Sequence, residues 1–293
     1  MVNKLNTYII LILVINGLAF LGIGCSGKGP STANNTSSAV DGNISVKGPD
    51  TILPLIYAEA EAFMNQSSGK IVSVTGGGSD VGIAALIDGQ VDIAYTQREV
   101  NAKEIENANK NGVNLVQHTI TYEGITAIVN PENPVSNLSF VQLRGIYVGN
   151  ISNWKDVGGE DRPIAVISGN SNSETYAYFK EDVLNNSEFR PDALATTKSI
   201  ASEVSQNPGA IGYISFAYSD NRVKALSLDI GTGSVPPTSD NIKNLKYPLS
   251  RPLYMYTNGA PTGLTKEFID FVTRVNGQTI VAQVGYIPLS PYV

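Results

Sequence analysis

The residues best suited to chemistry are small hydroxyl side chains that stand beside glycines at the ends of strand-like runs. The clearest group is Thr75-Gly76-Gly77-Gly78-Ser79-Asp80-Val81-Gly82-Ile83. Because the alternating run Ile71–Val74 precedes it and Ile83–Ile87 follows at helical spacing, the sequence predicts a strand, a glycine turn and a helix. Backbone N–H groups and the positive end of a helix dipole then meet at the turn, where a small anion could bind. The alternative is a plain turn in which Ser79 only caps the helix.

Two other junctions offer the same chemistry. They are Pro49-Asp50-Thr51 and Ser171-Asn172-Ser173-Glu174-Thr175, each with hydroxyl groups at a predicted helix start. A single junction of this kind needs no function, because every helix start has N–H groups to satisfy. Three of them could converge on one oxyanion in a cleft between two lobes, since open α/β sheets bind ligands at the carboxyl ends of their strands. Their convergence depends on the fold.

Residues for catalysis are sparse. The only histidine, His118, lies in a strand-like run without an evident partner, and no Gly-x-Ser-x-Gly elbow is present. One cysteine and one histidine do not supply a zinc site, and no Gly-Lys-Ser/Thr follows the glycine turn. We therefore expect no enzyme activity, no cofactor and no metal.

The N-terminal segment is typical of a secretory signal. Lys4 supplies the positive charge, Tyr8–Phe20 is an almost uncharged apolar run, and small residues follow up to Gly24. Residues 1–24 are therefore predicted to be a signal peptide. The alternative is an uncleaved membrane anchor, because the run is near the lower length limit for a span. In both cases the body of the protein faces the outside.

Cys25 is the only cysteine, so an intramolecular disulfide is impossible. It follows small residues and resembles the lipid-modified cysteine of a lipoprotein signal, although Gly22 stands where a leucine is usual and Leu21 is one place early. A lipid on Cys25 would tether the protein to the outer face of the membrane. The segment 25–43 is rich in Ser, Asn, Thr and Gly and reads as a flexible tether.

The charge balance argues against nucleic acid as a partner. Twenty-six acidic residues outnumber 20 lysines and arginines, which gives a net charge of −6. An anionic ligand would therefore be captured by local dipoles and donors rather than by a basic surface.

The chain from residue 44 onward alternates between strand-like and helix-like runs, which indicates an α/β fold. The predicted strands are 44–46, 71–74, 91–95, 113–120, 124–129, 163–167, 210–215, 223–229 and 253–257. The predicted helices are 53–65, one ending at 87, 103–110, 140–148, 175–184, 199–206 and a long final helix 265–282.

From 44 to 289 the chain resembles the substrate-binding proteins of phosphate ABC transporters. The most specific strings lie in the last third, at 209–214 (GAIGYI), 247–254 (YPLSRPLY), 277–278 (GQ) and 285–289 (GYIPL). The resemblance implies a two-lobed type II periplasmic-binding-protein fold with hinge crossovers near 121–124 and 250–254. Lobe 1 would be 44–121 plus 254–293, and lobe 2 would be 122–253.

The resemblance also implies a set of ligand positions. They are Thr51 and the backbone N–H of Ile52, Ser79, the segment Tyr95-Thr96-Gln97-Arg98, and Ser173-Glu174-Thr175 in place of a Ser-Gly-Thr motif.

Three departures from the family pattern concern selectivity. Some members have an aspartate at Gln97 that accepts a hydrogen bond from a protonated phosphate oxygen; a neutral amide should discriminate less well against sulfate. Many members have an arginine at Gly169, and Arg98 could supply that charge, although it could equally be an ion-pairing residue. Glu174 would repel an anion unless its carboxylate points away, so only its backbone N–H is expected to donate.

The expected protein is a monomeric, lipid-anchored receptor outside the cytoplasmic membrane. It would close on inorganic phosphate and deliver it to an ABC permease, without chemistry on the ligand. The alternatives are a receptor for another tetrahedral oxyanion, such as sulfate or arsenate, and a surface sensor or adhesion protein without a transport role.

Overall fold

The computed structural model describes residues 42–66, 69–195 and 199–289. The predicted signal peptide, Cys25 and most of the predicted tether lie outside these ranges. The first strand begins at Gly42, so Gly42 and Asn43 belong to the fold rather than to the tether. Within the described ranges, no helix has the length and apolar character that crossing a membrane requires.

The first part of the main sheet is built around three parallel strands. β1 (Gly42–Lys47) lies between β2 (Lys70–Thr75) and β3 (Ile93–Thr96). β12 (Ser250–Asn258) then pairs antiparallel with β3 and with β4 (Leu115–Val129).

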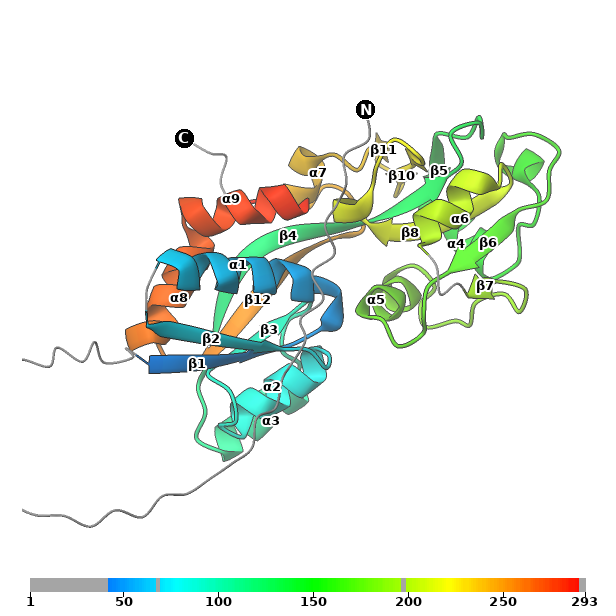
Figure 1. Ribbon diagram of the computed structural model, residues 1–293. Helices are drawn as coiled ribbons and strands as arrows, with labels where there is room; N and C mark the ends of the chain where they lie inside the picture. The colour runs from blue at the N-terminus through cyan, green and yellow to red at the C-terminus, as the bar shows by residue number, and fades with distance from the viewer. Residues whose placement is uncertain (1–41, 67–68, 196–198, 290–293) are drawn as a thin grey trace, which may run out of the picture. The chain divides into compact units, whose positions relative to one another are not determined.

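Helices cover both faces of this part of the sheet (Figure 1). One group comprises α1 (Leu53–Gln66), α8 (Gly263–Thr273) and α9 (Val275–Val284). The other comprises α2 (Ser79–Ile87) and α3 (Ala102–Lys110). Apolar side chains of the strands and of the first group form one core, in which Val46, Ile93 and Phe268 have no exposed surface.

β4 continues into the second part of the sheet. Its last five residues pair antiparallel with β8 (Ala210–Ser215), which pairs parallel with β6 (Ala165–Ser168). β7 (Leu194–Ala195) lies beside β6, and β9 (Lys224–Ala225) pairs with the end of β4. The strand order is therefore β2-β1-β3-β12-β4-β8-β6-β7.

The second part has its own core and a small additional sheet. Its helices are α4 (Phe140–Tyr147), α5 (Glu174–Asp182), α6 (Ile200–Gln206) and α7 (Ser239–Lys243). Its small sheet consists of β5 (Asn137–Ser139), β10 (Ser227–Asp229) and β11 (Ser234–Val235), and short 3-10 turns lie at η2 (Trp154–Val157) and η3 (Phe216–Tyr218). In the core, the rings of Phe179 and Tyr213 stack with their centroids 4.0 Å apart. This stacking holds α5 against β8 and so fixes the position of the helix that begins at the Ser171–Thr175 junction.

The two cores divide at β4 and β12. Ile120 and Leu253 belong to the first core, whereas Ile125 and Leu249 belong to the second. β12 also shifts register against β4 between Leu253 and Tyr254. The crossovers near 121–124 and 250–254 and the lobe boundaries remain a prediction.

Two predicted strands are one strand in the structure. The runs 113–120 and 124–129 form the single strand β4, because Gly124 does not break it but pairs with Ser250. A Cβ at Gly124 would lie 2.6 Å from Ile242 of α7. The glycine therefore allows α7 to pack closely on the strand.

The predicted long final helix is two helices. α8 and α9 are separated at Arg274, whose backbone is extended. A Cβ at Gly277 would lie 2.5 Å from the Phe271 carbonyl oxygen, so α9 turns back tightly against the end of α8. The predicted strand 223–229 is likewise interrupted at Leu226, where its hydrogen bonds change from β4 to the segment leading into β5.

Candidate functional site

The three hydroxyl-bearing junctions line one cavity of about 570 Å³. They are the 3-10 turn η1 (Asp50–Ile52), the glycine turn before α2, and the segment that leads into α5. The cavity wall consists of Asp50, Thr51, Gly77, Gly78, Asp80, Arg98, Asn170, Ser171, Asn172, Ser173, Glu174, Ala177, Tyr178, Glu181 and Arg251. The three junctions therefore meet at one cavity, but the predicted ligand residues Ile52 and Ser79 are fully buried and are not on its wall.

The glycine turn places Ser79 at the first position of α2. Gly78 is the N-cap with a φ of 102°, and it has no side chain that could cap the helix. Ser79 is fully buried, and its Oγ accepts a hydrogen bond of 3.3 Å from the Gln97 backbone N–H. The alternative that Ser79 is a simple N-cap is thus wrong. Its hydroxyl proton is left to donate to another acceptor.

Gln97 connects the η1 turn to the crossover strands. Its Nε2 donates to Glu123 on β4 at 2.9 Å, and its Oε1 accepts from the Thr51 hydroxyl. Because a carboxylate only accepts, this pairing fixes the amide orientation. Gln97 is fully buried and is absent from the cavity wall, while Thr51 lies on it. The Gln97 side chain therefore orients Thr51.

Glu123 and Arg251 form a buried ion pair between β4 and β12. The Arg251 Nε and Nη2 donate to one Glu123 oxygen at 3.0 and 2.9 Å. The guanidinium also lies over the Tyr178 ring of α5, 4.3 Å from its centroid. Burial raises the pKa of the Tyr178 hydroxyl, so it stays protonated and can donate at the cavity wall.

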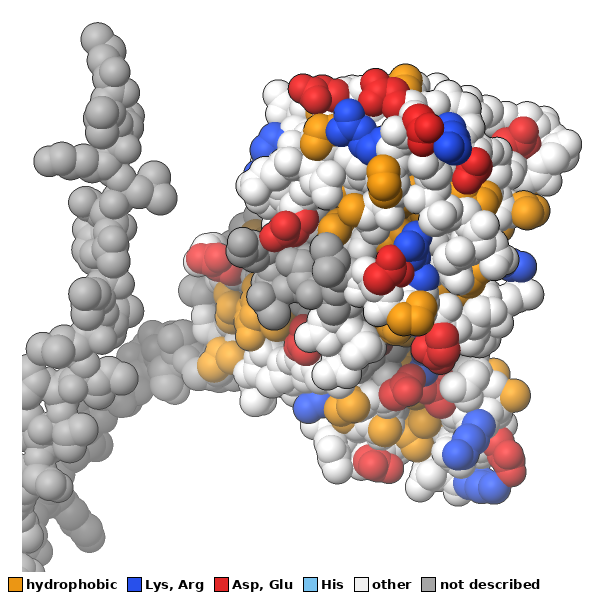
Figure 2. Space-filling model, turned by 90° about the vertical axis from the view of Figure 1, so that its right-hand side faces the viewer, with side chains coloured by type: hydrophobic (Ala, Val, Ile, Leu, Met, Phe, Trp, Pro, Cys, Tyr) orange, Lys and Arg blue, Asp and Glu red, His pale blue; other side chains and the backbone are white. Residues whose placement is uncertain are grey.

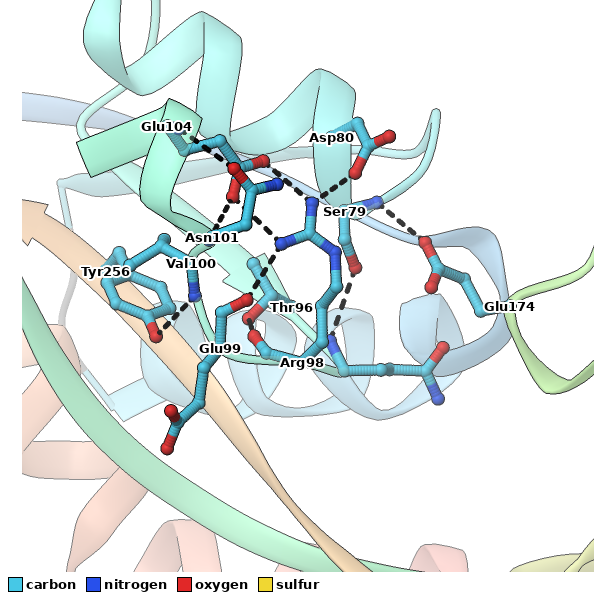
Figure 3. A network of polar contacts seen from close by, with 11 residues as sticks. Ser79, Asp80, Thr96, Arg98, Glu99, Val100, Asn101, Glu104, Glu174 and Tyr256 are labelled. Atoms are coloured by element: carbon cyan, nitrogen blue, oxygen red, sulfur yellow. Dashed lines mark hydrogen bonds and ion pairs between the residues drawn. The ribbon is translucent and has the colours of Figure 1, made fainter. Parts of the chain in front are cut away.

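Arg98 lies on the cavity wall within an ion-pair network. Its guanidinium donates to both Glu104 oxygens at 2.9 and 2.7 Å and also pairs with Asp80 (Figure 3). The hydrogen bonds to Glu104, followed by those to Asp80, raise the pKa of Arg98. The ion-pairing interpretation of Arg98 describes its contacts, and contact with a ligand remains a prediction.

The three residues at the start of α5, Ser173 to Thr175, have three different environments. Ser173 is the N-cap, and its Oγ accepts from the Tyr176 N–H at 3.1 Å. Thr175 lines a second cavity of about 390 Å³, which adjoins the first at Asp50, Thr51 and Ser173. Glu174 reaches across the first cavity, where its Oε1 accepts a 2.9 Å hydrogen bond from the Ser79 backbone N–H (Figure 3). The Glu174 carboxylate does not point away from the anion donors, which was the condition for it not to repel an anion.

The charge of the site is more acidic than expected for an anion receptor. The first cavity is lined by four carboxylates and two guanidinium groups, namely Asp50, Asp80, Glu174, Glu181, Arg98 and Arg251. Figure 2 shows acidic and basic side chains interspersed over the face in view rather than gathered by sign. The donors for an anion therefore come from helix starts and hydroxyl groups.

Several wall residues were not among the predicted ligand positions. Asp50 adjoins Thr51, and Arg251 belongs to the YPLSRPLY string, so the sequence held a signal for both. Tyr178 and Glu181 face the cavity only because α5 packs as it does. At Gly169 a Cβ would meet Ile200 at 3.6 Å, an ordinary contact, so the position could carry a side chain.

A family model described as a PBP superfamily domain matches residues 33–276. The site and the sheet thus belong to a two-lobed solute-binding protein. The phosphate-binding protein PstS of Bacillus subtilis is 33% identical over 98% of this chain and 95% of its own length. PstS of Staphylococcus aureus is 29% identical over 92% of this chain and 84% of its own.

Solved structures of phosphate-binding receptors have a fold similar to that of this chain. An ABC-type phosphate transport receptor from Vibrio cholerae has a TM-score of 0.73 and 34% identity, covering 83% of this chain and 99% of its own. PstS from Borrelia burgdorferi has a TM-score of 0.70 and 28% identity, covering 85% of this chain and 99% of its own. The chain belongs to the PBP superfamily and, within it, to the family of PstS phosphate-binding proteins.

Proposed function

We propose that this protein is an extracytoplasmic receptor that binds inorganic phosphate between its lobes and delivers it to an ABC permease. The observation that carries the proposal is the meeting of three helix starts at one cavity, within a chain of the PstS family. Phosphate would accept hydrogen bonds from Ile52 and Ser79 on one side and from Ser173 to Thr175 on the other. The Thr51 hydroxyl would join them by releasing Gln97, to which it donates in the structure. Arg98 is the proposed cationic contact.

The receptor binds and releases its ligand unchanged. No base, nucleophile or activated water is needed for this role, so we propose that the protein is not an enzyme. We also propose that it acts as a monomer, with Cys25 carrying the lipid that keeps it at the outer face of the membrane. The lobe boundaries proposed at 121/122 and 253/254 would let β4 and β12 act as the hinge.

A second candidate ligand is sulfate, and Gln97 favours it. An aspartate that faced the ligand would accept a hydrogen bond from the protonated oxygen that phosphate has and sulfate lacks. Gln97 lies behind Thr51, off the cavity wall, and offers the ligand no acceptor. Gln97 instead accepts from Thr51 and donates to Glu123. Selectivity against sulfate is therefore expected to be weaker than in members that have the aspartate.

The test is calorimetry of the full-length protein in detergent micelles with phosphate, sulfate and arsenate. We expect phosphate to bind most tightly. The substitution Ser79→Ala removes the hydroxyl donor while keeping the backbone N–H, and should weaken phosphate binding roughly ten- to hundredfold, as for a hydrogen bond to a charged group.

Ser73→Ala is the matched control, since Ser73 lies exposed on β2 and belongs to none of the three junctions. It should leave the affinity unchanged. Equal affinities of Ser79→Ala and wild type would remove the glycine turn from the site. Tight sulfate binding without phosphate binding would contradict the ligand assignment.

A further inference from the structure

The Glu174 carboxylate occupies a donor that an oxyanion would need. Glu174 lies on the first turn of α5, and its Oε1 is 2.9 Å from the Ser79 nitrogen at the start of α2. We propose that Glu174 is a tethered competitor: its carboxylate holds the α2 donor when phosphate is absent and must leave when phosphate binds. The proposal rests on the proposed function and makes Glu174 a determinant of affinity.

The geometry suits a carboxylate at this position. The helix start presents its N–H groups and the positive end of its dipole to the cavity. Gly78 has no side chain in the way, and even a Cβ there would be 3.9 Å from Glu174 Oε1. A negative oxygen is therefore accommodated at the Ser79 N–H, whether it belongs to a side chain or to a ligand.

The nearby cations do not hold Glu174 elsewhere. Arg98 is engaged with Asp80 and Glu104, and Arg251 is engaged with Glu123. The hydrogen bond that ties the Glu174 side chain to the opposite wall is the one from the Ser79 N–H. Glu174 can thus leave without breaking an ion pair to either guanidinium.

Phosphate and the Glu174 carboxylate cannot use this donor together. Both are negative, and two anions at hydrogen-bond distance from one N–H repel each other strongly in a partly buried site. The observed affinity is then the intrinsic affinity multiplied by the fraction of molecules in which Glu174 has left the donor. Removing the carboxylate should tighten phosphate binding.

The opposite effect is expected if Glu174 assists the ligand. A carboxylate could accept a hydrogen bond from a protonated phosphate oxygen, in which case its removal would weaken phosphate binding and reduce selectivity over sulfate. The direction of the change therefore separates competition from assistance.

The experiment is calorimetry with phosphate on full-length wild type, Glu174→Ala and Glu174→Gln in detergent micelles. We expect Glu174→Ala to bind roughly tenfold more tightly, which corresponds to a donor free in about one molecule in ten of the wild type. Glu174→Gln, which keeps the shape and loses the charge, should lie between the two.

Glu181→Ala is the control for charge alone. Glu181 lies on the same helix and the same cavity wall, but the α2 donor is held by Glu174. Its removal should tighten binding by no more than about twofold, as a general effect of one less negative charge. An equal gain in Glu181→Ala and Glu174→Ala would overturn the competitor role.

Hydrogen exchange of the Ser79 amide in phosphate-free buffer gives an independent readout. The amide should exchange faster in Glu174→Ala than in wild type, and at the wild-type rate in Glu181→Ala. Unchanged exchange, or unchanged or weaker phosphate affinity in Glu174→Ala, overturns the inference. Absence of phosphate binding in wild type and in all variants overturns the proposed function instead.

Discussion

At the scale of residues, His118 is the one histidine of the chain and lies on β4. Its Nε2 is 3.0 Å from the Thr257 Oγ1, which donates its own proton to the Gly259 carbonyl at 2.8 Å. Thr257 therefore accepts from a protonated Nε2, which suits the neutral imidazole. Burial lowers the pKa of His118 below its usual value near 6.5.

The lowered pKa of His118 predicts a pH dependence of stability. Below about pH 6.5 the unfolded chain takes up a proton that the folded imidazole resists, so the stability contribution of His118 falls as the pH falls from about 7 through 6.5. Because glutamine does not titrate, His118→Gln should lose this part of the pH dependence of stability. The check is the melting temperature of both proteins between pH 5.5 and 7.5: wild type should fall more steeply toward acid, and parallel curves would contradict the prediction.

Gln97 and Glu174 both differ in placement from the predicted ligand positions. Gln97, expected to face the ligand, is buried behind Thr51, whereas Glu174, expected to contribute only its backbone N–H, places its carboxylate at the α2 start. Ligand selectivity is therefore expected to depend on Glu174 as well as on Gln97.

At the scale of elements, β4 and β12 are joined by more than their backbone ladder. Glu123 and Arg251 are 2% and 9% exposed at their side chains and pair where the two cores divide. Glu123 also accepts from Gln97, and Arg251 stacks on Tyr178. This network ties the η1 turn, both crossover strands and α5 together.

Breaking the ion pair from one side should destabilise the protein. Arg251→Met leaves the Glu123 charge buried without its cation and should lower the free energy of unfolding by about 3–5 kcal/mol. The double variant Glu123→Gln/Arg251→Met should recover part of this loss, because no uncompensated charge remains. Urea unfolding of the wild type and of the two variants measures these free energies. A double variant no more stable than Arg251→Met would contradict the prediction.

At the scale of the whole molecule, the cavity between the helix starts couples ligand binding to stability. A ligand that binds only the folded protein stabilises it by RT ln(1 + [L]/Kd), about 2.7 kcal/mol at a hundredfold excess over Kd. For a chain of this size we expect phosphate to raise the melting temperature by roughly 5–10 °C. Thermal scans with phosphate and with sulfate at equal ionic strength measure it. A larger shift with sulfate would contradict the proposed ligand.

Much of the fold follows from local patterns. The alternating runs before Gly48 and Thr75 predict β1 and β2, and the helical spacings predict α1 to α3, because side-chain periodicity reflects which face is buried. The errors have tertiary causes. The sequence pattern predicts that the strand ends at Gly124. In the structure the strand continues, and the glycine is needed because a Cβ there would clash with Ile242 of α7. The pattern predicts one continuous helix through Arg274, but the backbone is extended there and α9 turns back against α8.

The amino-acid sequence is sufficient to predict the α/β alternation, the three hydroxyl-bearing junctions and, through its strings in the last third, the family resemblance. These are properties of local spacing and residue type. Three features depend on tertiary packing: the junctions face one cavity, Gln97 lies behind Thr51, and Glu174 reaches the Ser79 N–H. They depend on it because the packing of α5 on β8 and the pairing of β4 with β12 bring together side chains far apart in the chain.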